Sequence, residues 1–180
     1  MPSEQELETL YYRIAEGTPG QVLDVFGSTI EFVSWPSDPH GDFCVMRGVV
    51  PPGVTVPLHS HDDAEDFLIL AGTQDVLTQG EHGLRWAEAH AGDYVRVPGG
   101  TLHAHRNVSG QNAVDLIITT SRLGRFFQEV GRPATDAAQP PDPAELARFV
   151  ATAARYGYTL ATPEQNAAVG IQTPEFTGEG

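Results

Sequence analysis

The sequence of 180 residues contains no lysine, and all ten of its basic residues are arginine. Without a lysine amine, the chain cannot form a Schiff base with a carbonyl substrate or with pyridoxal phosphate. The 24 acidic side chains leave a formal net charge of −14. A balance this acidic argues against a nucleic-acid surface or an anionic membrane as a partner, because both bind clustered Arg and Lys.

Cysteine is nearly absent as well, since Cys44 is the only one. A single cysteine excludes a disulfide within the chain and a CxxC zinc or redox motif. No apolar run approaches the roughly 20 residues that a membrane helix needs. The first residues are acidic and amphipathic, not basic and then apolar. We therefore expect no signal peptide and a cytoplasmic location.

Short apolar or alternating runs fill the middle of the chain, with Gly or Pro between them about every 8 to 12 residues. Runs spaced in this way predict an all-β sandwich or barrel. No helical pattern of about 10 residues separates them, which disfavours a parallel sheet with crossover helices. The ten runs are Val22–Phe26, Thr29–Trp35, Phe43–Val50, Val54–His61, Phe67–Ala71, Gln74–Thr78, Leu84–Glu88, Asp93–Val97, Leu102–Arg106 and Val114–Thr119.

Helical patterns flank the predicted barrel. Ser3 and Glu6 form a capping-box pattern ahead of a helix that ends near Glu16. We assign residues 1–20 to an N-terminal helical arm, 21–121 to the barrel and 122–180 to a C-terminal helical extension and tail. Within the extension we predict a helix over Gly124–Val130, a Pro/Ala linker over Arg132–Pro143, a helix from Asp142 to Gly157 and a tail-like end over Gln165–Gly180.

Two histidines, His59 and His61, stand two residues apart in one of the predicted strands. Alternate residues of a strand point to the same face, so both imidazoles can reach one metal ion. Glu65 follows after a bend and can add a carboxylate oxygen. Taken alone, such a pair is a weak indication, because most histidine pairs on strands are solvated or hydrogen-bonded.

A second block, residues 92–107, brings a further histidine. Pro98 and Gly100 predict a turn that returns the next strand across the barrel, with His103 opposite the first pair. Together the two blocks resemble the two signature motifs of the cupin superfamily, G-x5-H-x-H-x3-E-x6-G and G-x5-P-x-G-x2-H-x3-N. Every fixed position of the two motifs is present: Gly53, His59, His61, Glu65, Gly72, Gly92, Pro98, Gly100, His103 and Asn107.

The resemblance implies a cupin double-stranded β-helix, which is a jelly-roll barrel, with one divalent metal ion inside it. It also implies that the ligands are His59, His61, Glu65 and His103. Three imidazoles and one carboxylate suit Fe, Mn, Ni, Co or Zn, and the ligand set does not choose among these metals.

His105 lies two residues beyond His103 and so faces the same side of its strand. Three roles stay open for it: a hydrogen-bond partner near the metal, an acid or base for the substrate, or a core histidine bonded to a backbone carbonyl. Glu65 and His105 are the candidate catalytic residues. In addition, we interpret the three aspartates around Glu65 as a solvated acidic rim, with Asp63 as an alternative ligand if the spacing shifts; they are Asp62, Asp63 and Asp66.

After the last predicted strand, Gly124-Arg-Phe-Phe-Gln-Glu-Val-Gly-Arg-Pro resembles the bacterial quercetinase-type cupins that have a single barrel. This resemblance implies a metal-dependent dioxygenase of the quercetin 2,3-dioxygenase type, which adds O2 to a mostly apolar, enolisable aromatic substrate. Two alternatives stay open: a non-oxidative polyketide cyclase or isomerase of secondary metabolism, and a cupin that binds metal or ligand without turnover. Because cupins commonly pair sheet to sheet, we also expect a homodimer.

Overall fold

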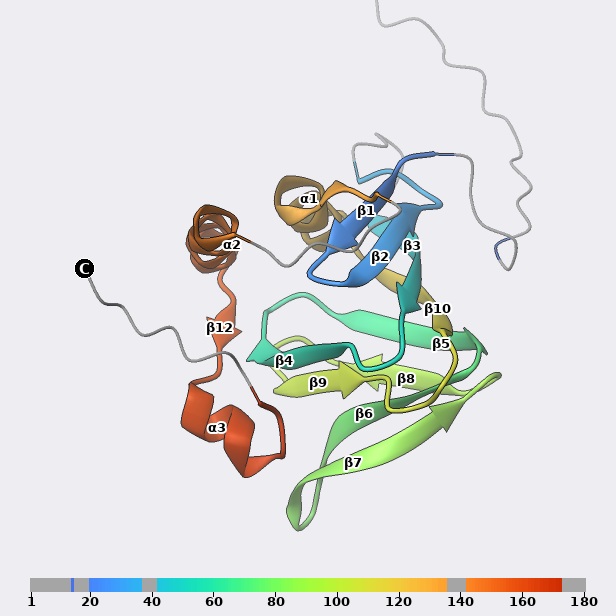
Figure 1. The fold of residues 1–180 in the computed structure, drawn as a ribbon, viewed down its shortest axis with the longest axis vertical. Helices are drawn as coiled ribbons and strands as arrows, with labels where there is room; N and C mark the ends of the chain where they lie inside the picture. The colour runs from blue at the N-terminus through green and yellow to red at the C-terminus, as the bar shows by residue number, and fades with distance from the viewer. Residues whose placement is uncertain (1–13, 15–19, 37–41, 136–141, 173–180) are drawn as a thin grey trace, which may run out of the picture.

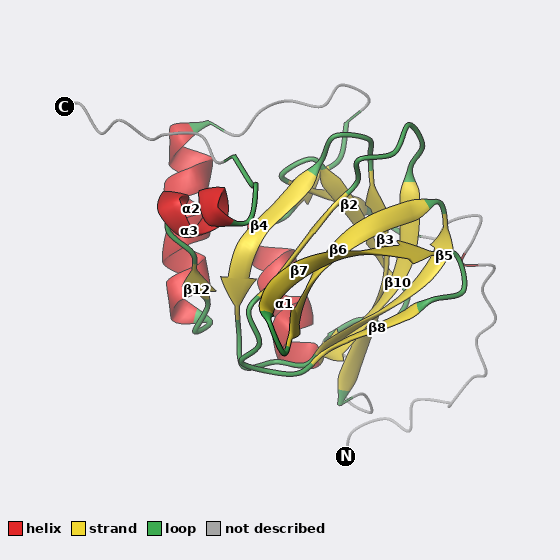
Figure 2. Cartoon of the chain, turned by 90° about the horizontal axis from the view of Figure 1, so that it is seen from below, coloured by secondary structure: helices red, strands yellow, loops and turns green. Residues whose placement is uncertain are grey.

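The structure, a computed structural model, describes residue 14 and residues 20–36, 42–135 and 142–172. Within these ranges the chain forms two antiparallel sheets that face each other (Figures 1 and 2). The first sheet has the strand order β11 (Arg132–Pro133), β1 (Val22–Val25), β2 (Ser28–Phe32), β3 (Phe43–Val50), β10 (Ala113–Thr120), β5 (Glu65–Ala71) and β8 (Tyr94–Val97). The second has the order β12 (Thr159–Leu160), β4 (Thr55–Ser60), β9 (His103–Arg106), β6 (Thr73–Gly80) and β7 (Gly83–His90).

The expected all-β barrel is therefore confirmed, and each of the ten predicted runs overlaps one of the strands β1 to β10. The core lies between the sheets because burial alternates along the strands: β3 and β10 each bury every second residue. The buried apolar cluster comprises Leu23, Ile30, Phe32, Cys44, Met46, Phe67, Ile69, Val76, Ala89, Val97 and Ile117.

Two helices pack together beside the first sheet. α1 (Ser121–Val130) follows β10 directly, and the Thr120 side chain caps it by accepting a hydrogen bond from the Leu123 N–H. α2 (Pro143–Arg155) begins after Asp142, as predicted, with a complete capping box. Buried Leu123 and Phe126 of α1 pack in one cluster with Ala153 of α2. The start of α1 was predicted at Gly124, three residues too late, because no turn residue separates strand from helix.

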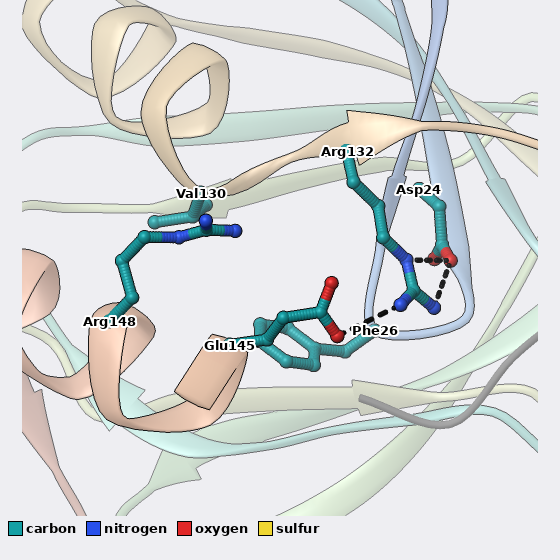
Figure 3. Close-up of a pocket in the computed structure, with 6 residues that line it drawn as sticks. All are labelled: Asp24, Phe26, Val130, Arg132, Glu145 and Arg148. Carbon is teal, nitrogen blue, oxygen red and sulfur yellow. Dashed lines mark hydrogen bonds and ion pairs between the residues drawn. The ribbon is translucent and has the colours of Figure 1, made fainter. Parts of the chain in front are cut away.

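Arg132 joins β11, β1 and α2 through two ion pairs (Figure 3). Its guanidinium donates to Asp24 Oδ2 at 2.9 and 3.0 Å and to Glu145 Oε2 at 3.0 Å. Arg148 lines the same small pocket (Figure 3). Since both carboxylates of this pocket are already paired with Arg132, we interpret it as a structural junction. The predicted linker accordingly begins with a strand, β11, that pairs with β1.

The predicted tail also differs from the structure as far as residue 172, and its residues 173–180 lie outside the described residues. Instead of a tail from Gln165, the structure has a third helix, α3 (Pro163–Ala168), beside β4 (Figure 2). Asn166 and Ile171 are 1% and 3% exposed, so this segment belongs to the packed body. The predicted N-terminal helix, apart from Ile14, lies outside the described residues. The helices that are described are all too short or too polar to cross a lipid bilayer.

Candidate metal centre

Four donor side chains from three strands and one loop meet at one end of the barrel. His59 lies on β4, His61 follows that strand, and Glu65 and His103 are the first residues of β5 and β9. Their ligand atoms all lie within 4.8 Å of one another. His61, Glu65 and His103 are buried and His59 is half-buried, so His59 marks the side on which the centre is more accessible.

Strand pairing and a glycine turn bring the two motifs together. β4 pairs with β9 so that His59 lies opposite His103. In the turn before β9, the Gly100 N–H donates to the His61 carbonyl at 2.7 Å. A Cβ on the preceding Gly99 would lie 2.0 Å from the Asp62 carbonyl oxygen. Only a glycine allows this approach, so the turn is held against the chain that carries His61.

Glu65 is central to the donor group. Its Oε2 lies 3.4 Å from His61 Nε2 and 3.6 Å from His103 Nε2. These separations are longer than a hydrogen bond. Two donors that share an ion with bonds of about 2.1 Å lie about 3.0 to 3.4 Å apart, depending on the coordination geometry. The spacing around Glu65 is close to that of donors which share a cation.

The orientation of each imidazole is set at its other nitrogen. Nδ1 of His59, His61 and His103 lies 2.7, 2.9 and 2.8 Å from the carbonyl oxygens of Pro57, Asp63 and Thr101. A carbonyl oxygen only accepts, so each Nδ1 donates. The Nε2 of each neutral ring therefore carries the lone pair, which is the tautomer that a metal ion needs.

Two of these lone pairs have no protein partner. His61 Nε2 and His103 Nε2 are buried and make no hydrogen bond. A buried polar atom without a partner is unfavourable, and both atoms face the Glu65 carboxylate. A divalent cation would satisfy both nitrogens and the carboxylate at once. The residues therefore fit a metal ion, and this His-His-Glu-His cluster could hold one.

The electrostatics of the centre favour positive charge. Burial alone would raise the pKa of Glu65, but its contacts with His103 and His61 outweigh burial and hold that pKa below its usual range. Burial opposes protonation of His103, yet the Glu65 carboxylate outweighs it and raises the pKa of His103. Burial and the nearby His103 lower the pKa of His59 to about 3, so this imidazole is a neutral ligand at neutral pH.

Comparison with known families identifies the fold that carries these donors. Residues 46–119 match the family model described as a cupin domain, and this range contains all four donors and His105. This part of the chain is a cupin domain.

Solved structures similar to this cupin are distant. The cupin 2 conserved barrel domain protein from Salinispora arenicola is 20% identical, with a TM-score of 0.48, 82% of this chain covered and 98% of that chain. The polyketide cyclase RemF from Streptomyces resistomycificus is 19% identical, with a TM-score of 0.49 and coverages of 70% and 84%. The oxalate decarboxylase from Lactobacillus farciminis is 16% identical, with a TM-score of 0.48 and coverages of 56% and 30%. No curated protein sequence matches this cupin. At this level of identity, those activities say nothing about the reaction of this chain.

The predicted acidic rim is wrong at one position of this cupin. Asp63 is only 7% exposed, and its carboxylate accepts hydrogen bonds from the Thr120 hydroxyl and the Arg122 guanidinium. These partners lie 57 and 59 residues away along the chain, which explains why the local pattern did not indicate them. Because both Asp63 oxygens are engaged, the alternative in which Asp63 replaces Glu65 as a ligand is not supported. Asp62 is exposed, as expected.

His105 lies on the barrel side of β9, where its ring packs against Phe67 with a centroid distance of 5.3 Å. Its Nδ1 is buried and has no hydrogen-bond partner. The backbone-carbonyl bond of a core histidine is thus not seen at this nitrogen. Burial lowers the pKa of His105 to about 4, so the imidazole is neutral at neutral pH.

Tyr158 also contacts the centre, and the sequence did not predict it there. The ring of Tyr158, which immediately precedes β12, packs against both His61 and His59, with centroid distances of 4.7 and 5.7 Å. Tyr158 lies outside both motifs, and no spacing relates it to the histidines. The pairing of β12 with β4 and the hydrogen bond from the Tyr158 N–H to the Ala153 carbonyl bring it there.

Proposed function

We propose that this cupin is a metal-dependent dioxygenase of the quercetin 2,3-dioxygenase type, which adds O2 to an enolisable aromatic substrate. The observation that carries the proposal is the place of Glu65, the one carboxylate among the donors, 3.4 and 3.6 Å from the nitrogens of His61 and His103. Such a reaction needs a base beside the metal to take a proton from a substrate hydroxyl. A bound divalent ion supplies Lewis acidity for the resulting enolate and, where it is redox-active, a route for electrons to O2.

Glu65 is suited to that proton transfer. Its contacts with the two imidazoles hold its pKa below the usual range, so it is ionised at neutral pH and can accept a proton. In the proposed step the substrate O–H bond breaks, the proton passes to a Glu65 oxygen and the substrate becomes an enolate. The enolate then supplies the electrons that reduce O2: the O–O bond and a carbon–carbon bond of the substrate break, both oxygen atoms become bonded to carbon in the product, and the proton returns from Glu65 as product forms.

The surroundings favour an apolar substrate without charge. The barrel core next to the donors contains the buried side chains of Phe67, Val76 and Ile117. Arg122, the cation close to the ligand loop, is committed to Asp63 and to the Tyr156 carbonyl. A substrate carboxylate or phosphate would therefore not find this guanidinium free. A neutral aromatic molecule that ionises only at the metal fits better.

The test is O2 consumption by protein reconstituted in turn with Fe, Mn, Ni, Co and Zn. With flavonols and other polyphenols, we expect uptake of one O2 per substrate for at least one redox-active metal. His59→Ala should abolish the uptake, whereas His90→Ala, which changes an exposed histidine, should not. Absence of O2 uptake with every metal and every substrate of this class would contradict the proposal.

A second candidate is a non-oxidative polyketide cyclase or isomerase, and His105 is the observation that favours it. A neutral imidazole with a free Nδ1, in the same barrel as Glu65, would give the site two groups that move protons. Together they could shift a proton between two substrate atoms without an oxidant. Turnover under strictly anaerobic conditions that is lost in His105→Gln, with the metal retained, would favour this reaction over the dioxygenase.

A further inference from the structure

The aromatic ring of Tyr158 connects the helical extension to the metal ligands. It stacks on Phe126 of α1 with a centroid distance of 4.3 Å and an interplanar angle of 25°. It is nearly parallel to His59, with an angle of 6° at 5.7 Å, and tilted by 45° against His61 at 4.7 Å. A row of aromatic contacts therefore runs from the core of the helical extension to two of the four donors.

Three interactions of Tyr158 and the neighbouring chain fix its position. Its N–H donates to the Ala153 carbonyl of α2 at 2.9 Å. In β12, the residues that follow it pair with Ser60 and His59 of β4. Finally, the Arg122 guanidinium binds both the Tyr156 carbonyl and the Asp63 carboxylate. The segment that carries Tyr158 is thus attached directly to the chain on either side of His61.

A ring contact adds an orientation that the Nδ1 hydrogen bonds do not supply. A hydrogen bond at one edge of an imidazole fixes that edge but leaves the ring free to tilt about the bond. Packing against the face of the ring restricts the tilt. His59 needs this restraint most, because it is half-buried whereas the other three donors are buried.

We propose that Tyr158 is a positioning residue of the metal centre: its ring holds the imidazoles of His59 and His61 at the angle in which both Nε2 atoms point at one ion. The affinity for metal and the ligand field then depend on a segment outside the cupin motifs. The proposal rests on the metal site of the proposed function, and not on O2 or on any substrate.

The experiment is a Co2+ titration of the metal-free protein, with the dissociation constant measured by chelator competition and the visible d–d spectrum recorded. In Tyr158→Leu and in Tyr158→Met we expect affinity to fall by about ten- to a hundredfold, which is the usual effect of losing a contact that orients a ligand. The d–d band should also shift. Two variants are used so that the test survives if one of them fails to fold.

Two controls separate positioning from general loss of packing. Tyr156→Leu removes a neighbouring ring that also packs on Phe126, at 5.5 Å, and whose hydroxyl binds Glu129. It should keep the wild-type affinity and spectrum. Tyr158→Phe keeps the ring and should behave like wild type as well. The proposal is overturned if Tyr158→Leu matches Tyr156→Leu in both readouts, or if Tyr158→Phe is as impaired as Tyr158→Leu.

These readouts involve neither O2 nor an organic substrate, so the two proposals fail separately. A changed Co2+ spectrum in Tyr158→Leu without O2 uptake by the wild type would leave the positioning role intact and reject the dioxygenase. O2 uptake by a Tyr158→Leu protein whose Co2+ spectrum is unchanged would support the dioxygenase and reject the positioning role of Tyr158.

Discussion

Asn166 of α3 is hydrogen-bonded to the backbone of Leu58, the residue immediately before His59, which is one of the four candidate metal ligands. Its Oδ1 accepts a hydrogen bond from the Leu58 N–H at 2.9 Å, although the two residues are 108 positions apart. Its Nδ2 donates to the carbonyls of Ala161 and Thr162 at 3.2 and 3.1 Å. With 1% exposure, this amide is the buried connection between the C-terminal segment and β4.

Asn166→Ala should destabilise the protein by about 2 to 4 kcal/mol, because it removes three hydrogen bonds and leaves the buried Leu58 N–H without a partner. Asn166→Asp keeps the acceptor and should cost less than the alanine variant at a pH where the carboxylate still accepts from Leu58. Urea unfolding measures both. A loss below about 0.5 kcal/mol in the alanine variant, the range of ordinary surface substitutions, would show that the amide does not secure α3.

Removing a single ligand should remove the metal. We expect wild-type protein to hold one equivalent of divalent ion by elemental analysis. His103→Ala should hold less than about a tenth of that, because the variant keeps only three of the four donors and loses one imidazole bond to the ion. His90→Ala is the matched control, because His90 is exposed and pairs only with Glu88 among the described residues. Equal metal content in the two variants would argue against this centre.

Asp115 should make stability depend on pH. Burial, despite a hydrogen bond from Gln74 at 3.0 Å, raises the pKa of Asp115 to about 6. The unfolded chain has an Asp pKa of about 3.9, so the folded state holds the extra proton between these values. The contribution of Asp115 to stability is then full below about pH 4 and is lost as the pH rises towards and through 6, by up to about 3 kcal/mol. Because other buried groups titrate in the same range, the measurement is the difference in free energy of unfolding between wild type and Asp115→Asn, from urea unfolding of metal-free protein at pH 4 to 8, and this difference should shift against wild type by that amount as the pH rises. A difference that does not change with pH would contradict it.

The expected homodimer remains a proposal, and the described strands give it a physical reason. β7 and β8 each end a sheet with no further described strand beside them. Unpaired strand edges favour association, and a twofold dimer is its commonest closed form. Light scattering after size exclusion should return twice the chain mass of 19.4 kDa. A mass of one chain would reject the dimer.

The strands of the barrel could be predicted because burial leaves its mark directly on the sequence. Each strand is a short, largely apolar or alternating run bounded by turn residues, and burial then alternates along it, as in β3 and β10. The two-residue strands β11 and β12 show no such period, and they form only because distant partners in β1 and β4 pair with them. Their absence from the prediction follows from their length.

The third helix, α3, could have been predicted from the sequence. Thr162 and Gln165 form the same capping box as Asp142 and Glu145, again with a proline at the first turn. The prediction missed this helix because few apolar residues surround Asn166. The helix is anchored by a buried amide and not by an apolar stripe.

His59 and His61 could be paired from their spacing because alternate residues of a strand share a face, whereas the full set with Glu65 and His103 came from the resemblance to the cupin motifs. The burial of Asp63 could not be predicted in this way, since its partners Thr120 and Arg122 are 57 and 59 residues away along the chain. Tyr158 is the extreme case. Its contact with His61 joins residues that are 97 positions apart in the sequence (158 − 61), and a tyrosine three residues after the end of α2 carries no local signal of such a neighbour.

The carbonyl acceptors of the three candidate ligand imidazoles lie only two residues from the rings they orient. Each ring is therefore aligned by its own short loop of chain, before any ion arrives. Little conformational entropy remains to be lost when the ion enters. We expect uptake to be limited by the dehydration of the ion and by the path past His59, so that metals which shed water slowly, such as Ni2+, should load more slowly than Co2+ or Zn2+ into the same site.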